Sequence, residues 1–599
     1  MAENGSPTGI DTPTNPPARG GATPPLLRLR RTTPELTSLM PVWARTPTTR
    51  RPSKSRRPQL PISTGAMEEA DNHRPASSAG RPFLSGLCAA ALRRKPIGAH
   101  ASTTASGEGL VRQLGVIELI LLGIGASIGA GIFVVTGTVA RDAGPGVTIS
   151  FVIAGAACVL NALCYAELAS RFPAVVGGAY LYTYAAFNEI TAFLVFTQLM
   201  VDYHISAASI ARSLASYFIQ LLELLPFLKG HIPNWIGHGE EFFGGVVSIN
   251  ILAPVLLILL TAILCYGVNE SSAVNTFMTT LKIVIVIVVV IAGVFEVDVS
   301  NWSPFMPNGF KSVVTGATVV FFAYVGFDAV ANSAEEAKRP QRDLPIGILA
   351  SLLACVLLYI AVCLVITGMV PYTLLGEDAP LAEAFAAKGL KFVTVLISIG
   401  AVAGLTTTLL VGLYVQAYSS AISDLVAFAV NFCLTLLSFW EQTGYSVVSA
   451  CVITLRWNDK ATNRRSLGIM SIWQEGVLCL VILALCGFVV GLCYRFNYSI
   501  AFIVVAFLIA IAASFALLFR QAYVAPPGFS CPGVPLVPII SVFFNMILFA
   551  QLHEEAWYRF VILSLIAVVI YAGYGQYNAA PSTSEQSSMG YQGVPSEAP

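Results

Sequence analysis

The sequence predicts an all-α, polytopic membrane protein. The chain has 599 residues, of which 55% are hydrophobic and only 11% are charged. A soluble globular protein carries roughly 25% charged residues, so this chain cannot cover a water-facing surface of its size. Its apolar residues gather into runs close to the ~20 residues that a helix needs to cross a bilayer. The formal net charge of +1 lacks the basic excess of a nucleic-acid-binding domain, which excludes nucleic acid as a partner.

The first 107 residues differ in composition from the rest and are predicted to be a disordered tail. Residues 1–66 hold ten Lys or Arg, three acidic residues and twelve prolines. Such a segment buries too little apolar surface to offset the entropy cost of ordering. A basic, Ser/Thr-rich and acid-poor composition is also typical of an organellar transit peptide. The alternative is that translation starts at Met67 and that the upstream stretch is a gene-model extension.

Residues 108–576 form the predicted membrane domain, and residues 577–599 a disordered cytoplasmic tail. Basic residues gather before the first apolar run, after the sixth and around Arg456, and short basic loops stay in the cytoplasm. The N-terminus is therefore expected on the cytoplasmic side. The predicted spans are residues 115–139, 148–170, 188–217, 247–268, 274–297, 312–333, 346–370, 391–416, 475–493, 499–519, 534–551 and 557–576.

The stretch between residues 417 and 456 does not fit this topology. The eighth span ends on the cytoplasmic side, and the basic cluster at Arg456 belongs there too, so an even number of crossings must lie between them. About 40 residues are available, and a return through residues 443–455 has only about 13, too few for the bilayer core. The segment is therefore predicted to be atypical.

The first and sixth spans are interrupted. Glycines including Gly123 and Gly125 crowd residues 123–131, and each weakens a helix by roughly 1 kcal/mol relative to alanine. The sixth span carries Gly326 and Asp328 at membrane depth, where irregular backbone is tolerated only around a protein-enclosed cavity. These spans hold matching positions in two five-span halves, which predicts the central site of a transporter. The alternative for the first span is close helix packing through small residues.

A zwitterionic substrate would suit this pair of breaks. Half-helix N-termini attract a carboxylate, and freed carbonyl groups accept hydrogen bonds from an ammonium group. Three ionisable residues lie well inside spans, where each costs roughly 2.5–3.5 kcal/mol. Asp202 would hold a cationic side chain or carry a proton, Lys282 would supply a fixed positive charge, and Asp328 would anchor the unwound backbone. A buried ion pair or a helix cap is the alternative for each. Glu167 is expected to be a bland interfacial residue.

The sequence contains no Walker A loop, catalytic triad, haem motif or zinc-spaced Cys/His cluster. We therefore expect neither an enzyme nor a bound metal or cofactor. The driving energy for transport is then an ion gradient or the gradient of the substrate itself.

Three long motifs resemble the amino acid–polyamine–organocation superfamily and, within it, the plant cationic amino acid transporters. They are GIGASIGAGIFVVTG in the first span, NALCYAELASRFP at the end of the second, and VVFFAYVGFDAVANSAEEAKRPQRDLPIGI across the sixth. The resemblance covers about residues 110–416 and 443–576. It implies a leucine-transporter-like inverted repeat of two five-helix halves plus additional C-terminal helices, about 12–14 spans in all, that moves amino acids by alternating access.

The resemblance also implies roles for individual residues. The α-carboxylate of the substrate would bind the backbone of Ser127, Ile128, Gly129, Ala130 and Gly131. Its α-amino group would bind carbonyl groups around Phe321, Phe322, Ala323 and Tyr324. The family's lysine that replaces sodium in proton-coupled members matches Lys282, and the stretch beside that ion site matches Thr406, Thr407 and Thr408.

Two departures from the family pattern affect these expectations. The family usually has a glutamate in the third span where this chain has Asp202, so a preference for arginine or lysine over neutral amino acids stays open. Residues 417–442 replace a basic loop, the ninth span and the first part of the tenth, and the family pattern resumes at Thr443. A mis-spliced or mispredicted exon explains both this departure and the topological mismatch most simply.

The sequence thus predicts a proton-coupled secondary transporter of L-amino acids, with arginine, lysine, glutamine or another neutral amino acid as substrate. Its partners would be this substrate, protons and the lipid bilayer, and the oligomeric state is left open. Two alternatives are a non-transporting amino acid sensor of the same fold and an inactive product of an aberrant gene model. The expected location is the vacuolar or plasma membrane, with a plastid membrane as the alternative.

Overall fold

A computed structural model describes residues 91–93, 112, 114–129, 131–172, 178–223, 233, 236, 240–242, 247–265, 272–376, 379–417, 441–457, 472–526 and 528–575. Contacts divide the chain into Met1–Ala79 and Gly80–Pro599, and every described residue belongs to the second unit. The predicted tails, apart from residues 91–93, lie outside the described residues, as do residues 418–440 of the atypical segment.

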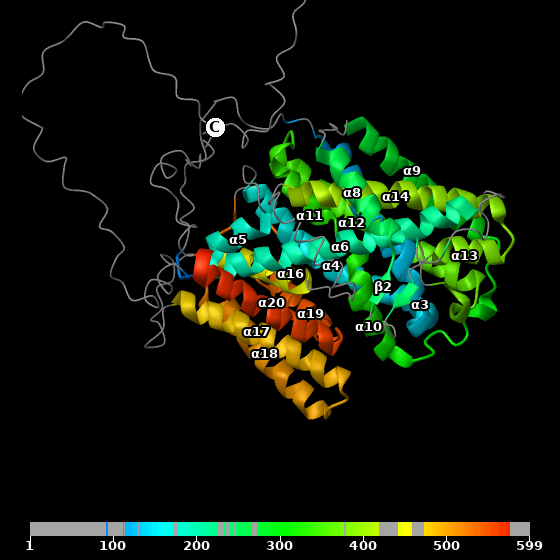
Figure 1. The fold of residues 1–599 in the computed structure, drawn as a ribbon. Coiled ribbons are helices and arrows are strands. Elements are labelled where there is room, and N and C mark those ends of the chain that lie inside the picture. Colours follow the sequence, from blue (N-terminus) through cyan, green and yellow to red (C-terminus); the bar gives the residue numbers. More distant parts are fainter. Residues whose placement is uncertain are drawn as a thin grey trace, which may run out of the picture. The chain divides into compact units, whose positions relative to one another are not determined.

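Helices make up most of the described chain (Figure 1). The first half contains α2 (Val116–Ser127), α3 (Thr136–Ala143), α4 (Val147–Arg171), α5 (Gly178–Ala186), α6 (Glu189–Glu223), α8 (Leu252–Cys265) and α9 (Ser272–Val294). The second half contains α10 (Gly309–Val320), α11 (Phe327–Asn332), α12 (Pro340–Met369), α13 (Pro380–Ala387), α14 (Lys391–Ala417) and α16 (Glu441–Leu455). The C-terminal helices are α17 (Ile472–Arg495), α18 (Ile500–Arg520), α19 (Leu536–Ala550) and α20 (Glu554–Ile570).

Short elements join these helices. A two-stranded antiparallel sheet pairs β1 (Glu240–Phe242) with β2 (Val247–Ile249), with Glu241 opposite Ser248. The 3-10 helices are η4 (Gly144–Gly146), η5 (Val299–Trp302), η6 (Phe321–Tyr324), η7 (Ser333–Glu335) and η8 (Tyr372–Leu374). The π-helices are η3 (Gly131–Val135) and η9 (Tyr571–Gly575).

The prediction of an all-α polytopic fold is confirmed. Nine helical runs among the described residues are long and apolar enough to cross a membrane, and α8, α16 and α19 contain shorter apolar helices. Each predicted span coincides with described helical elements: the first covers α2, η3 and part of α3, and the sixth covers α10, η6 and α11. α8 begins after the predicted residue 247 because residues 247–249 form β2. α16 has 15 residues, about 22 Å at 1.5 Å per residue, which is shorter than the bilayer core.

The outer faces of the C-terminal helices show why the chain needs a lipid environment. α18 leaves many large apolar side chains exposed, which water would not tolerate on this scale but lipid would. They include Ile500, Phe502, Val504, Val505, Phe507, Leu508, Ile509, Ile511, Phe515, Leu518 and Phe519. Its buried positions are small, namely Ala506, Ala510 and Ala513, together with Leu517, which allows α17 to pack closely against it.

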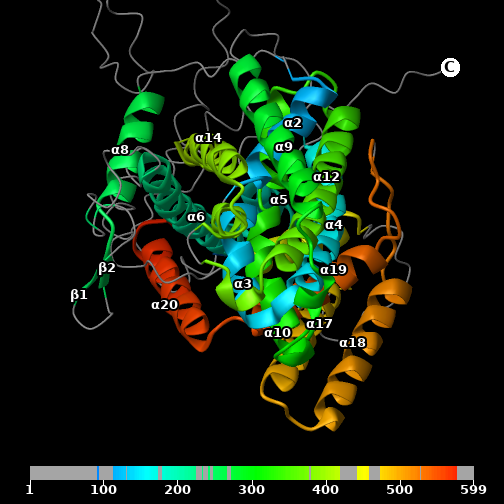
Figure 2. The ribbon, with the colours of Figure 1, turned by 90° about the vertical axis from the view of Figure 1, so that its right-hand side faces the viewer.

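Two groups of helices can be separated by their packing. α4 packs against α10, α11 and α12, and α12 and α11 pack against α2, so the interrupted helices share one group with α4. α6 packs instead against α8 and α14 (Figures 1 and 2). The C-terminal helices reach both groups, because α19 contacts α4 and α10 whereas α20 contacts α6.

Candidate functional site

Both interruptions predicted from the sequence are present, and they lie against each other. α2 ends at Ser127 and the π-helix η3 starts at Gly131, while α10 gives way to the 3-10 helix η6 and then to Gly326. Gly326 has φ of +138°, and a Cβ there would lie 2.7 Å from the backbone nitrogen of Ser127. A Cβ on Gly131 would lie 2.2 Å from Cα of Ala323. Only glycine permits this approach of the two backbones.

Tyr359 of α12 ties the two breaks together. Its hydroxyl group bonds to the carbonyl oxygens of Ser127 and Ala323 at 2.8 and 2.9 Å. The side chain is fully buried, so this bridge is shielded from water. Sequence reasoning missed this residue, because a single tyrosine in a long apolar helix looks like a packing residue.

The backbone groups expected to hold a substrate have partners of their own in this conformation. The N–H of Ile128 donates to Ile124 O at 2.8 Å, and Phe322 O accepts from Val325 N at 3.2 Å. The carbonyl oxygen of Phe322 keeps a second lone pair for a ligand, whereas the single N–H of Ile128 is already used within α2. The predicted residue Ala130 lies outside the described residues, and the flanking Gly129 and Gly131 are buried.

Lys282 on α9 lies at the broken end of α2. Its Nζ donates to Gly125 O at 2.8 Å, to Ile128 O at 3.5 Å and to Thr408 Oγ1 at 3.3 Å. The side chain is 1% exposed. Carbonyl oxygens at a helix C-terminus carry partial negative charge, which stabilises a cation there. The ammonium group therefore lies where these three oxygen atoms converge.

Of the three threonines expected beside Lys282 on α14, one contacts it. Thr408, not Thr406 or Thr407, contacts the ammonium group, and its Oγ1 also bonds to the oxygens of Gly125 and Ile128 at 3.2 Å. Thr407 bonds back to Ala403 O and Gly404 O of its own helix. Thr406 is only partly buried. Successive helix positions differ by about 100° in direction, so only one of the three threonines can face this point.

Gly123 and Gly125 serve the close packing of neighbouring helices. A Cβ on Gly125 would lie 2.4 Å from Thr279 Oγ1, and one on Gly123 would lie 2.4 Å from Ser351 Oγ. Both glycines are buried within α2. At these two positions the small-residue packing alternative describes the observed contacts, whereas the break itself begins after Ser127.

Asp328 caps the short helix that follows the second break. Its Oδ1 accepts from the backbone N–H of Gly326 at 3.1 Å and of Ala329 at 3.0 Å. Its Oδ2 accepts a hydrogen bond from the hydroxyl group of Tyr203 on α6. These bonds fit both the expected anchor of the unwound backbone and the helix-cap alternative. They also connect that backbone to α6.

Asp202 is buried on α6, with 4% of its surface exposed, directly before Tyr203. Tyr324 points away from the break, because its hydroxyl group donates to Phe151 O on α4 at 2.8 Å. The ring of Phe321 packs against Tyr445 on α16, with centroids 5.9 Å apart. Tyr324 and Phe321 can therefore offer a ligand their backbone carbonyls but not these side-chain faces.

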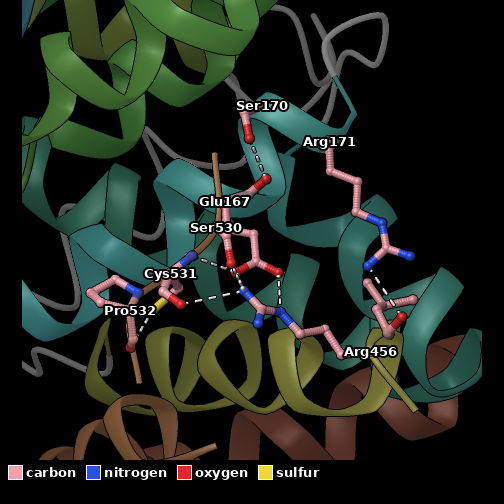
Figure 3. A network of polar contacts seen from close by, with 8 residues as sticks. Glu167, Ser170, Arg171, Arg456, Ser530, Cys531 and Pro532 are labelled. Atoms are coloured by element: carbon pink, nitrogen blue, oxygen red, sulfur yellow. Dashed lines mark hydrogen bonds and ion pairs between the residues drawn. The ribbon is translucent and has the colours of Figure 1, made fainter. Parts of the chain in front are cut away.

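Glu167, near the end of α4, forms a buried ion pair with Arg456 (Figure 3). The expectation that Glu167 is a bland interfacial residue is therefore wrong. Glu167 is fully buried, and both its carboxylate oxygens accept hydrogen bonds from Arg456. Arg456 also donates to Ser530 Oγ at 2.8 Å, while the N–H of Cys531 donates to Glu167 at 2.9 Å. A buried pair this well bonded joins α4, α16 and the loop before α19.

The chain matches known proteins along most of its length. Residues 114–570 match a family model described as amino acid permease. Cationic amino acid transporter 9, chloroplastic, of Arabidopsis thaliana is 61% identical over 557 residues, covering 86% of this chain and 97% of the relative. The branched-chain amino acid permease BcaP of Bacillus subtilis is 36% identical over 487 residues, covering 81% and 97%. Cationic amino acid transporter 4, vacuolar, of Arabidopsis thaliana is 29% identical over 583 residues, covering 81% and 95%.

These comparisons contradict the expected location in the vacuolar or plasma membrane. The relative with 61% identity is chloroplastic by name, whereas the vacuolar relative is 29% identical to this chain over 583 residues. The sequence favoured the wrong membrane because nothing in the hydrophobic spans encodes a destination. The plastid alternative came from the basic, acid-poor tail, whose composition is typical of a transit peptide.

Proposed function

Because this chain belongs to the amino acid permease family, among the plant cationic amino acid transporters, we propose that it carries L-amino acids across a plastid membrane as a secondary transporter. The names of its relatives support amino acids as the substrate class, both cationic and branched-chain. A permease family also agrees with the expectation that the chain is not an enzyme.

The observation that carries the proposal is the contact of two broken helices tied together by Tyr359. We propose that the substrate binds where these breaks meet, with its α-carboxylate at the backbone of residues 127–131 and its α-amino group at carbonyls of residues 321–324. The α-amino group and the Tyr359 hydroxyl group then share the carbonyl oxygen of Ala323, while the α-carboxylate accepts from backbone N–H groups of residues 127–131. Binding would draw both half-helices onto one ligand, which closes one gate before the other opens.

We further propose that the transport is coupled to protons. Lys282 provides a permanent positive charge at the broken end of α2, so a sodium ion is not needed there. The carboxyl groups of Asp202 and Asp328 are buried and can each take up a proton. Asp328 is bonded to both helix groups through Gly326 and Tyr203, so its protonation would loosen a contact between them.

Uptake by proteoliposomes tests this function. The purified chain is reconstituted, and labelled arginine, glutamine and leucine are offered with and without an inward proton gradient. We expect at least one substrate to accumulate and its accumulation to rise with the gradient. Accumulation that is the same with and without the proton gradient would contradict proton coupling but would still support amino acid transport.

Two other outcomes define the alternatives. Amino acid binding without flux, measured by a shift in melting temperature, would identify a sensor of the same fold. Neither binding nor flux from a correctly folded protein would indicate an inactive product, which the transcript across codons 416–443 would explain if it lacks an exon.

A further inference from the structure

We propose that the C-terminal residues 536–575, which form α19, α20 and η9, act as a strap between the two helix groups that move against each other during transport. The inference rests on the proposed alternating access. The first group contains α4 and the interrupted helices, and the second contains α6, α8 and α14. One end of the strap is fixed to each group, so the strap opposes their relative motion.

The first end of the strap is fixed to α4 by a buried polar knot. Asn161 of α4 accepts hydrogen bonds at its Oδ1 from Asn545 at 2.8 Å and from Ser541 at 2.7 Å, and its own amide donates to Asn545 Oδ1 at 3.0 Å. All three side chains are at most 1% exposed. On the neighbouring α10, Thr318 Oγ1 donates to Leu548 O at 3.1 Å. Polar bonds shielded from water hold α19 firmly on this group.

The loop that leads into α19 adds a second attachment to the same helix. The backbone N–H of Cys531 donates to Glu167 of α4 at 2.9 Å, inside the ion pair with Arg456 (Figure 3). α19 is therefore held to α4 both before its first residue and along its length. Motion of α4 must carry α19 with it.

The second end of the strap contacts α6 through α20, and one tyrosine of η9 adds a buried hydrogen bond to that helix. The hydroxyl group of Tyr571 in η9 donates to Glu189 Oε1 at 2.9 Å, and both side chains are 1% exposed. The Tyr571 ring packs against Phe193 of α6 with centroids 5.5 Å apart. The other oxygen of Glu189 accepts from Tyr184 of α5 at 2.7 Å and lies 3.6 Å from Arg93. Glu189 is the first residue of α6, so its bond to Tyr571 attaches η9 to the N-terminal end of that helix.

The corner between α19 and α20 is braced rather than loose. Arg495 of α17 donates to the carbonyl oxygens of Gln551, at 2.9 Å, and of Leu552. Its guanidinium group lies 5.1 Å from the ring centroid of Trp557 on α20, and the Trp557 indole donates to Phe549 O at 3.2 Å. The corner therefore transmits displacement from α19 to α20 instead of absorbing it.

The number of bonds at each attachment indicates which one breaks first when the two helix groups move. When α4 moves relative to α6, the braced corner does not bend, and the knot around Asn161 has several bonds to break. The α6 end depends on the packing of α20 against α6, one ring contact and the bond of Tyr571 to Glu189, so it has fewer polar bonds than the α4 end and is the part that releases. Until it does, the strap stabilises the conformation described here and slows the exchange between conformations.

A double-mutant cycle on turnover tests the strap. Tyr571→Phe removes the bond to Glu189 and keeps the ring. Asn545→Ala removes two of the three bonds that join α19 to Asn161 at the other end, with Ser541→Ala as a milder variant should Asn545→Ala fold poorly. Tyr558→Phe, on the exposed side of α20, is the matched control. We expect each single variant to raise the uptake turnover number at least twofold at an unchanged KM, and Tyr558→Phe to leave it unchanged.

The double variant separates a strap from two unrelated contacts. Cutting one end already frees a strap, so the double variant should turn over no faster than the faster single variant. Effects that multiply, or single variants with wild-type turnover, would overturn the inference. If the wild type transports nothing, the proposed function fails, and hydrogen exchange then decides on the strap alone. We expect Asn545→Ala and Tyr571→Phe each to speed amide exchange in residues 554–575, and unchanged exchange would overturn the inference.

Discussion

The charge of Lys282 is held by three oxygen atoms from two helices, and its removal should abolish coupling to the proton gradient. Lys282→Met keeps the length of the side chain but leaves the carbonyls of Gly125 and Ile128 to share the single hydroxyl proton of Thr408. An unmet buried polar group costs about 1–3 kcal/mol. We expect gradient-driven accumulation in proteoliposomes to fall at least tenfold, because the break of α2 loses its fixed cation.

A second lysine provides the control. Lys311 lies exposed on α10, so Lys311→Met removes the same charge from the chain without touching the break. Equal losses in both variants would show that net charge, not the position of Lys282, matters. Lys282→Arg should not restore function, because the planar guanidinium cannot occupy the site of a compact ammonium group.

Gln442 is a buried polar side chain that weakens the fold. It is fully buried in α16, and neither its oxygen nor its nitrogen has a hydrogen-bond partner among the described residues. Gln442→Leu keeps the approximate volume and removes this burial cost, so it should raise stability by about 1–3 kcal/mol. Thermal unfolding in detergent measures the change.

The matched substitution at another buried glutamine should act in the opposite direction. Gln551 is 2% exposed and its amide donates to Gly491 O at 2.8 Å. Gln551→Leu loses that bond and should lower the melting temperature. A lower melting temperature for Gln442→Leu as well would mean that its amide meets a partner when the protein is in solution.

Charged residues were easier to assign from the sequence than neutral ones. Lys282 and Asp328 could be singled out because a charge inside a span is costly and rarely idle. Tyr359 could not, since a lone tyrosine in an apolar run has no such cost. Choosing among three successive threonines needs the rotation of α14 about its axis, which only tertiary packing fixes.

At the scale of elements, the break in the sixth span depends on Gly326. Its φ of +138° is strained for any other residue, and a Cβ would lie 2.7 Å from the backbone of Ser127. Gly326→Ala should therefore cost at least about 1–3 kcal/mol for the backbone alone. We expect a lower melting temperature and loss of uptake, because the two breaks are forced apart.

Gly309 is the control for the backbone term. It has φ of +74°, and nothing lies within 4 Å of a Cβ built there. Gly309→Ala carries strain without the clash, so it should reduce stability less and leave uptake intact. Equal effects of the two substitutions on uptake would show that the contact between the breaks is not needed for transport.

The positions of the helices followed from the sequence, because apolar length alone defines a membrane span. Their interruptions could also be predicted, since clustered glycines and a buried acid are local signals. The burial of Glu167 could not, because its partners Arg456 and Cys531 lie 289 and 364 residues away. Pairings over such distances leave no pattern in the local sequence.

At the scale of the whole chain, the family could be recognised from three motifs, but the assembly of the C-terminal helices could not. The attachment of α19 to α4 depends on Asn161, Ser541 and Asn545, which are ordinary polar residues in apolar helices. The target membrane could not be predicted from the spans either, because their apolar residues are suited to any bilayer.

The N-terminal tail should direct the chain to the plastid without taking part in transport. Residues 80–599 contain every described contact, including that of Arg93 with Glu189. A chain that starts at a new methionine before Gly80 should therefore show uptake within twofold of the full chain in proteoliposomes. In leaf cells a C-terminal fluorescent fusion of the same truncated chain should no longer reach plastids, because the basic, acid-poor segment is missing.

A longer truncation distinguishes targeting from folding. Removing residues 1–93 also removes Arg93, whose partner Glu189 receives the strap, so this variant should have a lower melting temperature than the shorter truncation. If the chain without residues 1–79 still reaches plastids, the transit function of the tail is refuted. If that chain instead reaches plastids no longer and also loses uptake in proteoliposomes, the tail belongs to the transporter itself, and its basic residues act on the membrane domain.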